Sequence, residues 1–189
     1  MHRRSIQSFG TSIPTYALGA IFLVPLSIGV LLVNSNASQN DHANQISRDL
    51  ASMYAQGMDF SQHANQGIAQ RVAEGLGVNI RAGEGVLILS KIRMVQDSDC
   101  PTGPRCANQG HAVIAQRYVM GNVGLRASSF GTPSSIEAAS GNVRNWAIDH
   151  SARAENFAAA LKPGEVTYAA ECYIASRDSN GSVYSRAMF

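Results

Sequence analysis

"SFGTSIPTYALGAIFLVPLSIGVLLV", residues 8–33, is the stretch that decides how the fold is interpreted. Its part 13–33 has no charged residue and reaches the roughly 20 apolar residues that a helix needs to cross a bilayer. Arg3 and Arg4 precede this part, and Asp41 is the first charge after it. Because positive residues stay on the cytoplasmic side of a membrane span, the sequence predicts a single pass with a cytoplasmic N-terminus. The remaining chain would then lie in the periplasm of a bacterium.

A cleaved signal peptide is the alternative interpretation of the same segment. Ser35, Asn36 and Ala37 form a small-x-small site, so cleavage after Ala37 would release a secreted binding or adhesion module. The apolar run is longer than the about 7–15 residues of a usual signal core. The sequence after it also continues with a helical pattern, which favours a retained anchor.

That helical pattern is an apolar stripe with spacings of three and four residues. It consists of Ala43, Ile46, Leu50 and Met53. Gly57 follows and is a suitable helix stop. The sequence therefore predicts one long helix from about Pro14 to Gln56, apolar all round in its first half and amphipathic in its second. Such a helix suits a pilin stalk, and it equally suits a membrane anchor that runs into a packed helix.

The rest of the chain predicts an α+β domain. A second helix is expected between Asp59 or Ser61, which can cap it, and the glycines Gly75 and Gly77. A short helix is expected at about Ala152 to Leu161. Alternating apolar residues predict strands in "GEGVLILSKIRMV" (83–95), "HAVIAQRYVMG" (111–121), "EVTYAAECYIAS" (165–176) and "SVYSRAMF" (182–189). Strands without repeated βαβ units indicate an antiparallel sheet of three or four strands.

Composition and motifs argue against catalysis and against nucleic-acid binding. The net charge is only +2 and no basic stripe is present, so a nucleic-acid partner is not expected. The five histidines have no metal-ligand spacing, and no nucleophile elbow or phosphate loop occurs. The sequence therefore predicts no enzyme, no cofactor, no metal and no small-molecule substrate.

The cysteines point to one disulfide and one buried thiol. Cys100 and Cys106 lie close together in the turn-rich loop "DSDCPTGPRC", and they would pair if this part of the chain is outside the cytoplasm. Cys172 lies on the apolar face of an expected strand, which favours a packed thiol over a nucleophile. Asp97 and Asp99 beside Cys100 are better explained by a turn than by a calcium loop.

An ordered series of segments resembles the TadE-like family, the minor pilins or pseudopilins of tight-adherence (Tad) pilus systems. The series is "IPTYALGAIFLVPLSIGVLLVN", "LASMYAQGMDFSQHANQGIAQRVAEGLG", "GVLILSKIRMV", "AVIAQRYVMGN", "LRASSFGTP", "LKPGEVTYAAECYIAS" and "VYSRAMF". The resemblance covers nearly the whole chain, and Val24-Pro25 supplies the family's apolar-Pro step. It implies a pilin-like fold: a long N-terminal transmembrane helix that continues into a periplasmic head. It also implies contacts with other pilins and with the inner-membrane assembly platform.

The resemblance also implies a processing site. Prepilin peptidases of such systems cut after a glycine, so Gly10 is the candidate and Thr11 the new first residue. The family has Glu at the fifth mature position, where this chain has Thr15, followed by Tyr16. Threonine cannot carry the charge that neutralises a neighbour's terminal amine. The chain is therefore either not processed or docks without that ion pair.

Small residues in the apolar run would permit close packing against other helices. They are Gly19, Ala20, Ser27 and Gly29, with Pro25 loosening the helix between them. The sequence thus predicts three parts: a basic N-terminus or leader over 1–12, a transmembrane helix over 13–33, and a periplasmic α+β domain over 34–189.

Overall fold

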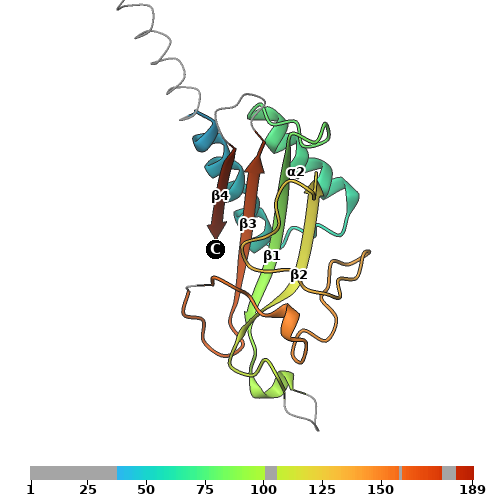
Figure 1. The fold of residues 1–189 in the computed structure, drawn as a ribbon, viewed down its shortest axis with the longest axis vertical. Coiled ribbons are helices and arrows are strands. Elements are labelled where there is room, and N and C mark those ends of the chain that lie inside the picture. Colours follow the sequence, from blue (N-terminus) through green and yellow to red (C-terminus); the bar gives the residue numbers. More distant parts are fainter. Residues whose placement is uncertain (1–37, 101–105, 158, 176–181) are drawn as a thin grey trace, which may run out of the picture. The chain divides into compact units, whose positions relative to one another are not determined.

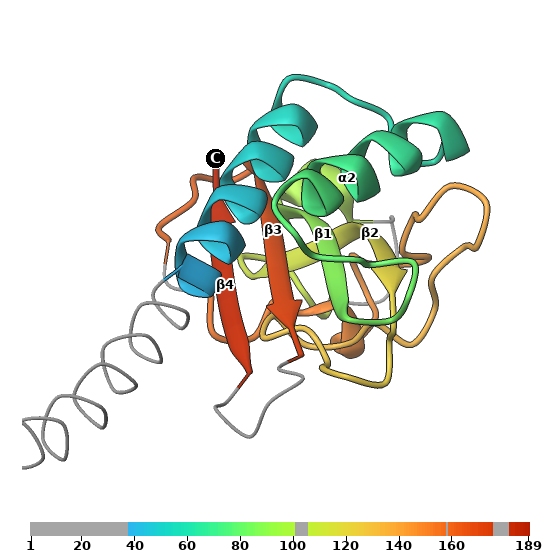
Figure 2. The same ribbon diagram turned by 90° about the horizontal axis from the view of Figure 1, so that it is seen from above.

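The structure of the protein, a computed structural model, describes residues 38–100, 106–157, 159–175 and 182–189. Residues 39–189 group together as one unit. In this unit a helix covering 38–55 and helix α2 (His63–Gly75) lie on one face of an antiparallel sheet, and long irregular connections lie on the other (Figures 1 and 2). The sheet therefore has two differently covered faces, one helical and one made of loops.

The sheet has four strands in the order β2-β1-β3-β4, and every neighbouring pair is antiparallel. The strands are β1 (Gly85–Met94), β2 (Ala112–Gly121), β3 (Val166–Ile174) and β4 (Val183–Met188). Ser90 in β1 lies opposite Arg117 in β2 and Ala169 in β3. Because β1 is central and covered on both faces, its residues 85–90 are all buried.

The helical face holds the larger of two hydrophobic clusters. Leu87 and Leu89 of β1 lie beneath the helices, together with Cys172 of β3. From the helix covering 38–55, the predicted stripe packs against them, with Ala43, Ile46 and Leu50 buried and Met53 partly buried. Helix α2 contributes Ala69 and Ala73. The three- and four-residue spacing in the sequence thus identifies the buried side of the first helix.

The second hydrophobic cluster lies on the loop-covered face. Ile92 and Val113 from the sheet meet Phe130, Val143 and Ala152 from the connection between β2 and β3. This connection contains the 3-10 helix η2 (His150–Ala152), and a second one, η1 (Asp97–Asp99), follows β1. The connection is therefore a packed layer of the domain.

The predicted fold class, with a long transmembrane helix entering the head, is wrong for the residues that the structure describes. Within those residues, no helix combines the length and the apolar character that a bilayer crossing requires. The helix covering 38–55 has one buried face and exposes Asp41 and Arg48 on the other. This helix is amphipathic, and its apolar side packs on the sheet. The segment 13–33 lies outside the described residues.

The predicted short helix at about Ala152 to Leu161 is also wrong. Its backbone groups bond to other segments: Ala154 N donates to Ala112 O (2.9 Å) and Glu155 N to Phe130 O (3.0 Å). Arg153 forms a β-bridge with Val113. Asn156 has a φ of 50°, which also interrupts a right-handed helix. Tertiary pairing with β2 therefore replaces the local helix, and only η2 remains.

Candidate functional site

Two opposite charges are buried on the loop-covered face of the sheet. Arg117 of β2 is 4% exposed and Glu171 of β3 is 3% exposed. Arg117 lies opposite Ser90 in β1, and Glu171 lies opposite Ile88, so both charges share the face of these two residues. Burial of isolated charges is strongly unfavourable, and the surroundings must therefore provide hydrogen-bond partners.

The guanidinium of Arg117 has three acceptors. Nε donates to Ser90 Oγ (3.2 Å), Nη2 donates to Ser128 Oγ (3.0 Å), and Nη1 donates to the carbonyl oxygen of Gly131. Burial lowers the pKa of Arg117 to about 10, and the negative charge of Glu171 acts against that shift. Arg117 thereby ties segment 128–131 to the sheet.

The carboxylate of Glu171 is held from the same segment and from β4. Oε1 accepts hydrogen bonds from Ser129 N (2.8 Å), Ser129 Oγ (2.7 Å) and Tyr184 Oη (2.6 Å), and Oε2 accepts from Ser128 Oγ. Desolvation, with the hydrogen bond to Glu171, raises the pKa of Tyr184 to about 12. Ser128 therefore links the two charges, because its hydroxyl accepts from Arg117 and donates to Glu171.

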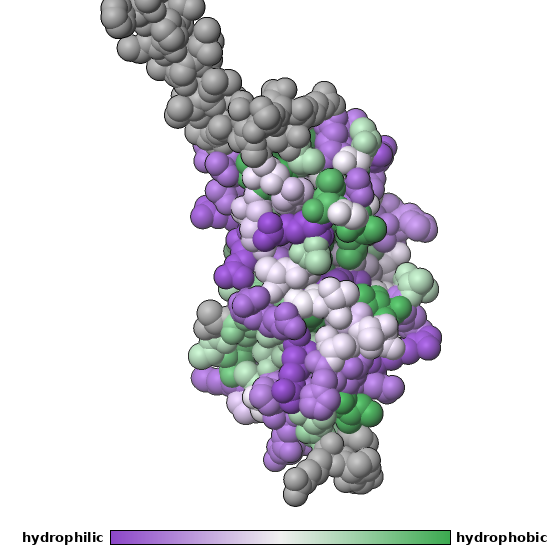
Figure 3. Space-filling view, in the orientation of Figure 1, coloured by the Kyte–Doolittle hydropathy of each residue, from purple (hydrophilic) through white to green (hydrophobic). Residues whose placement is uncertain are grey.

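A shallow pocket of about 190 Å³ adjoins this network. Its apolar lining includes Ile88 from β1 and Val119 from β2, with Val123 and Ile136 from the following connection. Val119, Val123 and Ile136 are 40%, 68% and 39% exposed. Figure 3 shows hydrophobic surface areas lying among hydrophilic ones on this view of the molecule. The pocket is the place in the site where a ligand can meet apolar side chains.

Arg126 supplies a second positive charge to the pocket lining. Its guanidinium carbon lies 3.9 Å from the ring centre of Tyr184 and 5.8 Å from that of Tyr173. Across the described parts of the chain, Arg126 makes no hydrogen bond and no ion pair with a carboxylate. Its donors are therefore available to a ligand, whereas those of Arg117 are used within the protein.

The serine hydroxyl between the two charges is fully engaged within the protein. The Ser128 hydroxyl is engaged by Arg117, Glu171 and the backbone N of Phe130 (3.1 Å). No group of three or more His, Cys, Asp or Glu side chains that could hold a metal occurs in the residues described. What the site offers to a partner is an apolar depression with a cation, Arg126, beside it.

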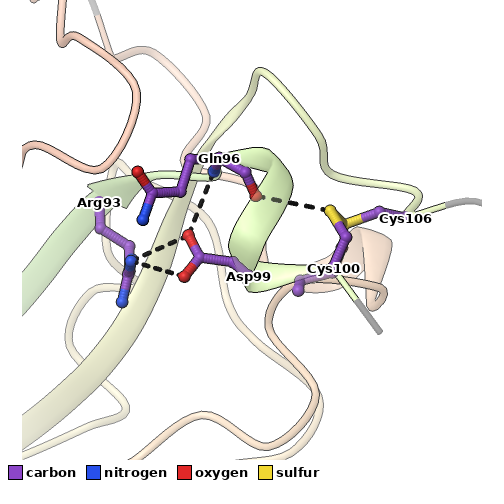
Figure 4. Close-up of polar contacts among 6 residues, drawn as sticks. Arg93, Gln96, Asp99, Cys100 and Cys106 are labelled. Atoms are coloured by element: carbon purple, nitrogen blue, oxygen red, sulfur yellow. Dashed lines mark hydrogen bonds and ion pairs between the residues drawn. A yellow bond between two sulfur atoms is a disulfide. The ribbon is translucent and has the colours of Figure 1, made fainter. Parts of the chain in front are cut away.

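A second polar cluster lies around the Cys100–Cys106 disulfide (Figure 4). Arg93 Nη2 donates to both carboxylate oxygens of Asp99 at 2.9 Å, and Asp99 Oδ2 accepts from Gln96 N at 3.1 Å. The Cys100 sulfur lies 3.6 Å from Gln96 O. The Cα atoms of the two cysteines are 5.3 Å apart. These contacts and the disulfide hold the chain in place after β1, so the role of this cluster is structural.

Only some of the candidate residues from the sequence lie within the part of the chain that the structure describes. The processing and helix-packing candidates lie outside the described residues: Gly10, Thr11, Thr15, Tyr16, Gly19, Ala20, Pro25, Ser27 and Gly29. Cys100 and Cys106, the candidate disulfide pair, are bonded. Cys172 is a buried free thiol, and its burial raises its pKa to about 12.

Sequence reasoning missed Arg117, Arg126, Ser128 and Glu171. A usable signal was present for two of them, because Arg117 and Glu171 each interrupt an apolar strand, in "AVIAQRYVM" and "VTYAAECYI". A charge inside such a strand is buried only when it has partners. Ser128 and Arg126 lie in an irregular connection, where spacing carries no such signal.

Comparison with known proteins gives no relative for this chain. It matches no family model, no curated protein and no solved structure. The functional interpretation therefore rests on the segments quoted from the sequence and on the geometry of the site.

Proposed function

We propose that this chain is a non-enzymatic component of a Tad-type pilus assembly system, acting as a minor pilin or pseudopilin. The apolar segment 13–33 attaches it to the bacterial inner membrane, and the folded domain lies in the periplasm. Its partners are other pilins and the inner-membrane assembly platform. The ordered series of TadE-like segments along the sequence supports the family assignment within this proposal.

The contact role is supported by the different uses of the buried and the exposed groups in the candidate site. The buried charges of Arg117 and Glu171 are used to hold segment 128–131 on the sheet. The exposed groups beside them are aliphatic, with Arg126 as the accompanying cation. Exposed aliphatic groups with a cation beside them suit recognition of a protein partner, which needs no reacting group.

The Cys100–Cys106 disulfide supports the periplasmic location. Disulfides form and persist in oxidising compartments such as the periplasm, and they are rare in the cytoplasm. A bond that closes the short loop between residues six positions apart also suits a domain that must persist outside the cell's reducing interior. The location and the chemistry of the cysteines therefore agree.

Cross-linking in intact cells tests this proposal. Membrane and soluble fractions are separated, the protein is recovered from each, and its N-terminus and cross-linked partners are identified by mass spectrometry. We expect recovery from membranes, a start at Met1 or Thr11, and cross-links to Tad pilus proteins. Recovery from the soluble periplasm with Ser38 as first residue, without such cross-links, would overturn the proposal in favour of the secreted module.

A further inference from the structure

The Cys100–Cys106 disulfide contacts the connection between β2 and β3 as well as the end of β1. Cys106 Sγ lies 3.3 Å from the carbonyl oxygen of Ala147, and the same oxygen accepts a hydrogen bond from Asn108 N (3.0 Å). Both cysteines, like Trp146, pack against the second hydrophobic cluster. The bond therefore fixes the chain at a point where two segments, distant in the sequence, meet.

The two residues that follow the disulfide hold this connection by hydrogen bonds. The side chain of Asn108 is fully buried, and its Nδ2 donates to Trp146 O (2.7 Å) and to Asp149 O (2.6 Å). Arg153 completes the group, because its Nε donates to Asn108 Oδ1 (2.9 Å) and its Nη2 donates to Ala107 O (2.7 Å). These two residues therefore hold the middle of the connection in place.

The same connection forms a wall of the apolar pocket. Ile136, which lines the pocket, forms a β-bridge with Val143. Just before it, Ser134 Oγ donates to Asp149 Oδ2 (2.9 Å) and accepts from Ser151 Oγ (3.0 Å). A continuous series of hydrogen bonds therefore leads from the residues beside the disulfide to the pocket wall.

The helical face of the sheet is packed independently of the disulfide. Its hydrophobic cluster is separate from the one that the cysteines contact, and it contains the buried residues of the helix covering 38–55 and of α2. Local opening of a protein follows such independently packed units. Loss of the disulfide should therefore release the connection and leave the helices on the sheet.

We propose that the Cys100–Cys106 disulfide is a redox-controlled clamp on the connection between β2 and β3. Both cysteines are partly exposed, so a dithiol reductant, such as a dithiol oxidoreductase, can reach the bond. Two electrons and two protons pass to the protein: the S–S bond breaks, two thiols form, and the dithiol closes to its own disulfide. The clamp then opens, and oxidation closes it again. The inference rests on the proposed function only where it implies that a reduced chain lacks its ordered contact surface.

Hydrogen–deuterium exchange of the full-length protein in detergent micelles, before and after treatment with dithiothreitol, tests the inference. Mass spectrometry of peptic fragments locates the change. We expect the amides of residues 142–153 to exchange roughly tenfold faster or more after reduction, and those of residues 43–54 and of α2 to be unchanged. Re-oxidation should restore the slow exchange. Alkylation of the reduced, folded protein should label both cysteines of the former bond and not Cys172, which is buried.

Variants separate the clamp from a general loss of stability. The double substitution Cys100→Ser with Cys106→Ser should give the fast exchange without reductant and no further response to it. Asn108→Ala, which removes the side-chain bonds to the connection, should open the same residues in the oxidised protein. Gln70→Ala, in α2, is its control and should leave the exchange of the connection unchanged.

Four results would overturn the inference. They are a bond that dithiothreitol does not reduce in the folded protein, unchanged exchange of the connection after reduction, faster exchange throughout the helices as well, and an Asn108→Ala variant that exchanges like the wild type. Normal pili in a deletion strain, together with the expected exchange of the purified protein, would instead overturn only the proposed function.

Discussion

Arg117 and Glu171 show how single residues connect the sheet to the segment that forms the site. Both are charged and almost fully buried, and each is surrounded by hydrogen bonds from segment 128–131. A buried charge that keeps its partners can be nearly neutral for stability, but removal of one partner leaves the other uncompensated. The pair therefore specifies where this segment lies.

Replacement of Glu171 tests this role. Glu171→Gln keeps the shape of the side chain but removes its charge, which leaves Arg117 buried without an opposite charge. We expect the free energy of unfolding to fall by about 3 kcal/mol, measured by urea denaturation. The control is Glu137→Gln, at an exposed carboxylate paired with Arg144, where the change should stay within about 0.5 kcal/mol. Equal, small effects at both positions would contradict the role.

Tyr184 predicts a loss of stability at alkaline pH. Its pKa is raised from 10.0 to about 12 in the folded protein, so the folded state holds the phenolic proton more tightly than the unfolded state. The contribution is fully present below pH 10 and is lost as the pH rises towards about 12. Tyr184→Phe should therefore flatten the decline in unfolding free energy over this window. Identical pH profiles for the variant and the wild type would refute the assignment.

At the scale of elements, the sequence patterns predict the regular parts of the domain and fail where tertiary pairing dominates. Period-two alternation correctly predicts all four strands, and glycines mark the ends of the helices, with Gly57 at φ 93° after the first. The local helix predicted in the connection between β2 and β3 does not form because backbone groups of this connection bond to β2 and to distant parts of the connection itself, as Ala154 N does to Ala112 O and Glu155 N to Phe130 O. Arg126 and Ser128 lie in this connection, which explains why spacing did not identify them, whereas Arg117 and Glu171 lie in predicted strands.

Glycine is required at Gly121 and at Gly57 for different physical reasons. Both have positive φ, 95° and 93°. A Cβ at Gly57 would meet open space, whereas one at Gly121 would collide with the carbonyl oxygen of Gly85 and lie 2.8 Å from a side-chain carbon of Ile80. We expect Gly57→Ala to cost about 1 kcal/mol from backbone strain alone. Gly121→Ala should cost about 3 kcal/mol because overpacking is added. Thermal and urea unfolding measure both, and equal costs would refute the steric argument.

The disulfide should stabilise the end of β1 and the start of the following segment. Cys100 and Cys106 close a short loop, which restricts the unfolded chain, and the double substitution Cys100→Ser with Cys106→Ser should cost about 2 kcal/mol. Reductant should lower the urea midpoint of the wild type and leave that of the double variant unchanged. A wild-type midpoint that does not respond to reductant would show that the bond contributes nothing.

At the scale of the whole molecule, the domain is asymmetric. Two helices cover one face of the sheet (Figure 2), while the loop-covered face carries the buried charge pair and the apolar pocket. The groups available to a partner at this site lie on the loop-covered side. Under the proposed function, this side of the domain would be the contact surface, and the helices would support the sheet from the other side.

The central claim is that this protein acts by contact within a Tad-type pilus system. The most direct measurement is pilus formation in a strain from which the gene has been deleted, scored by electron microscopy and by adhesion to a surface. The claim predicts that pili and adhesion are lost and that the full-length gene, supplied again, restores both. A deletion strain with normal pili and normal adhesion would contradict it.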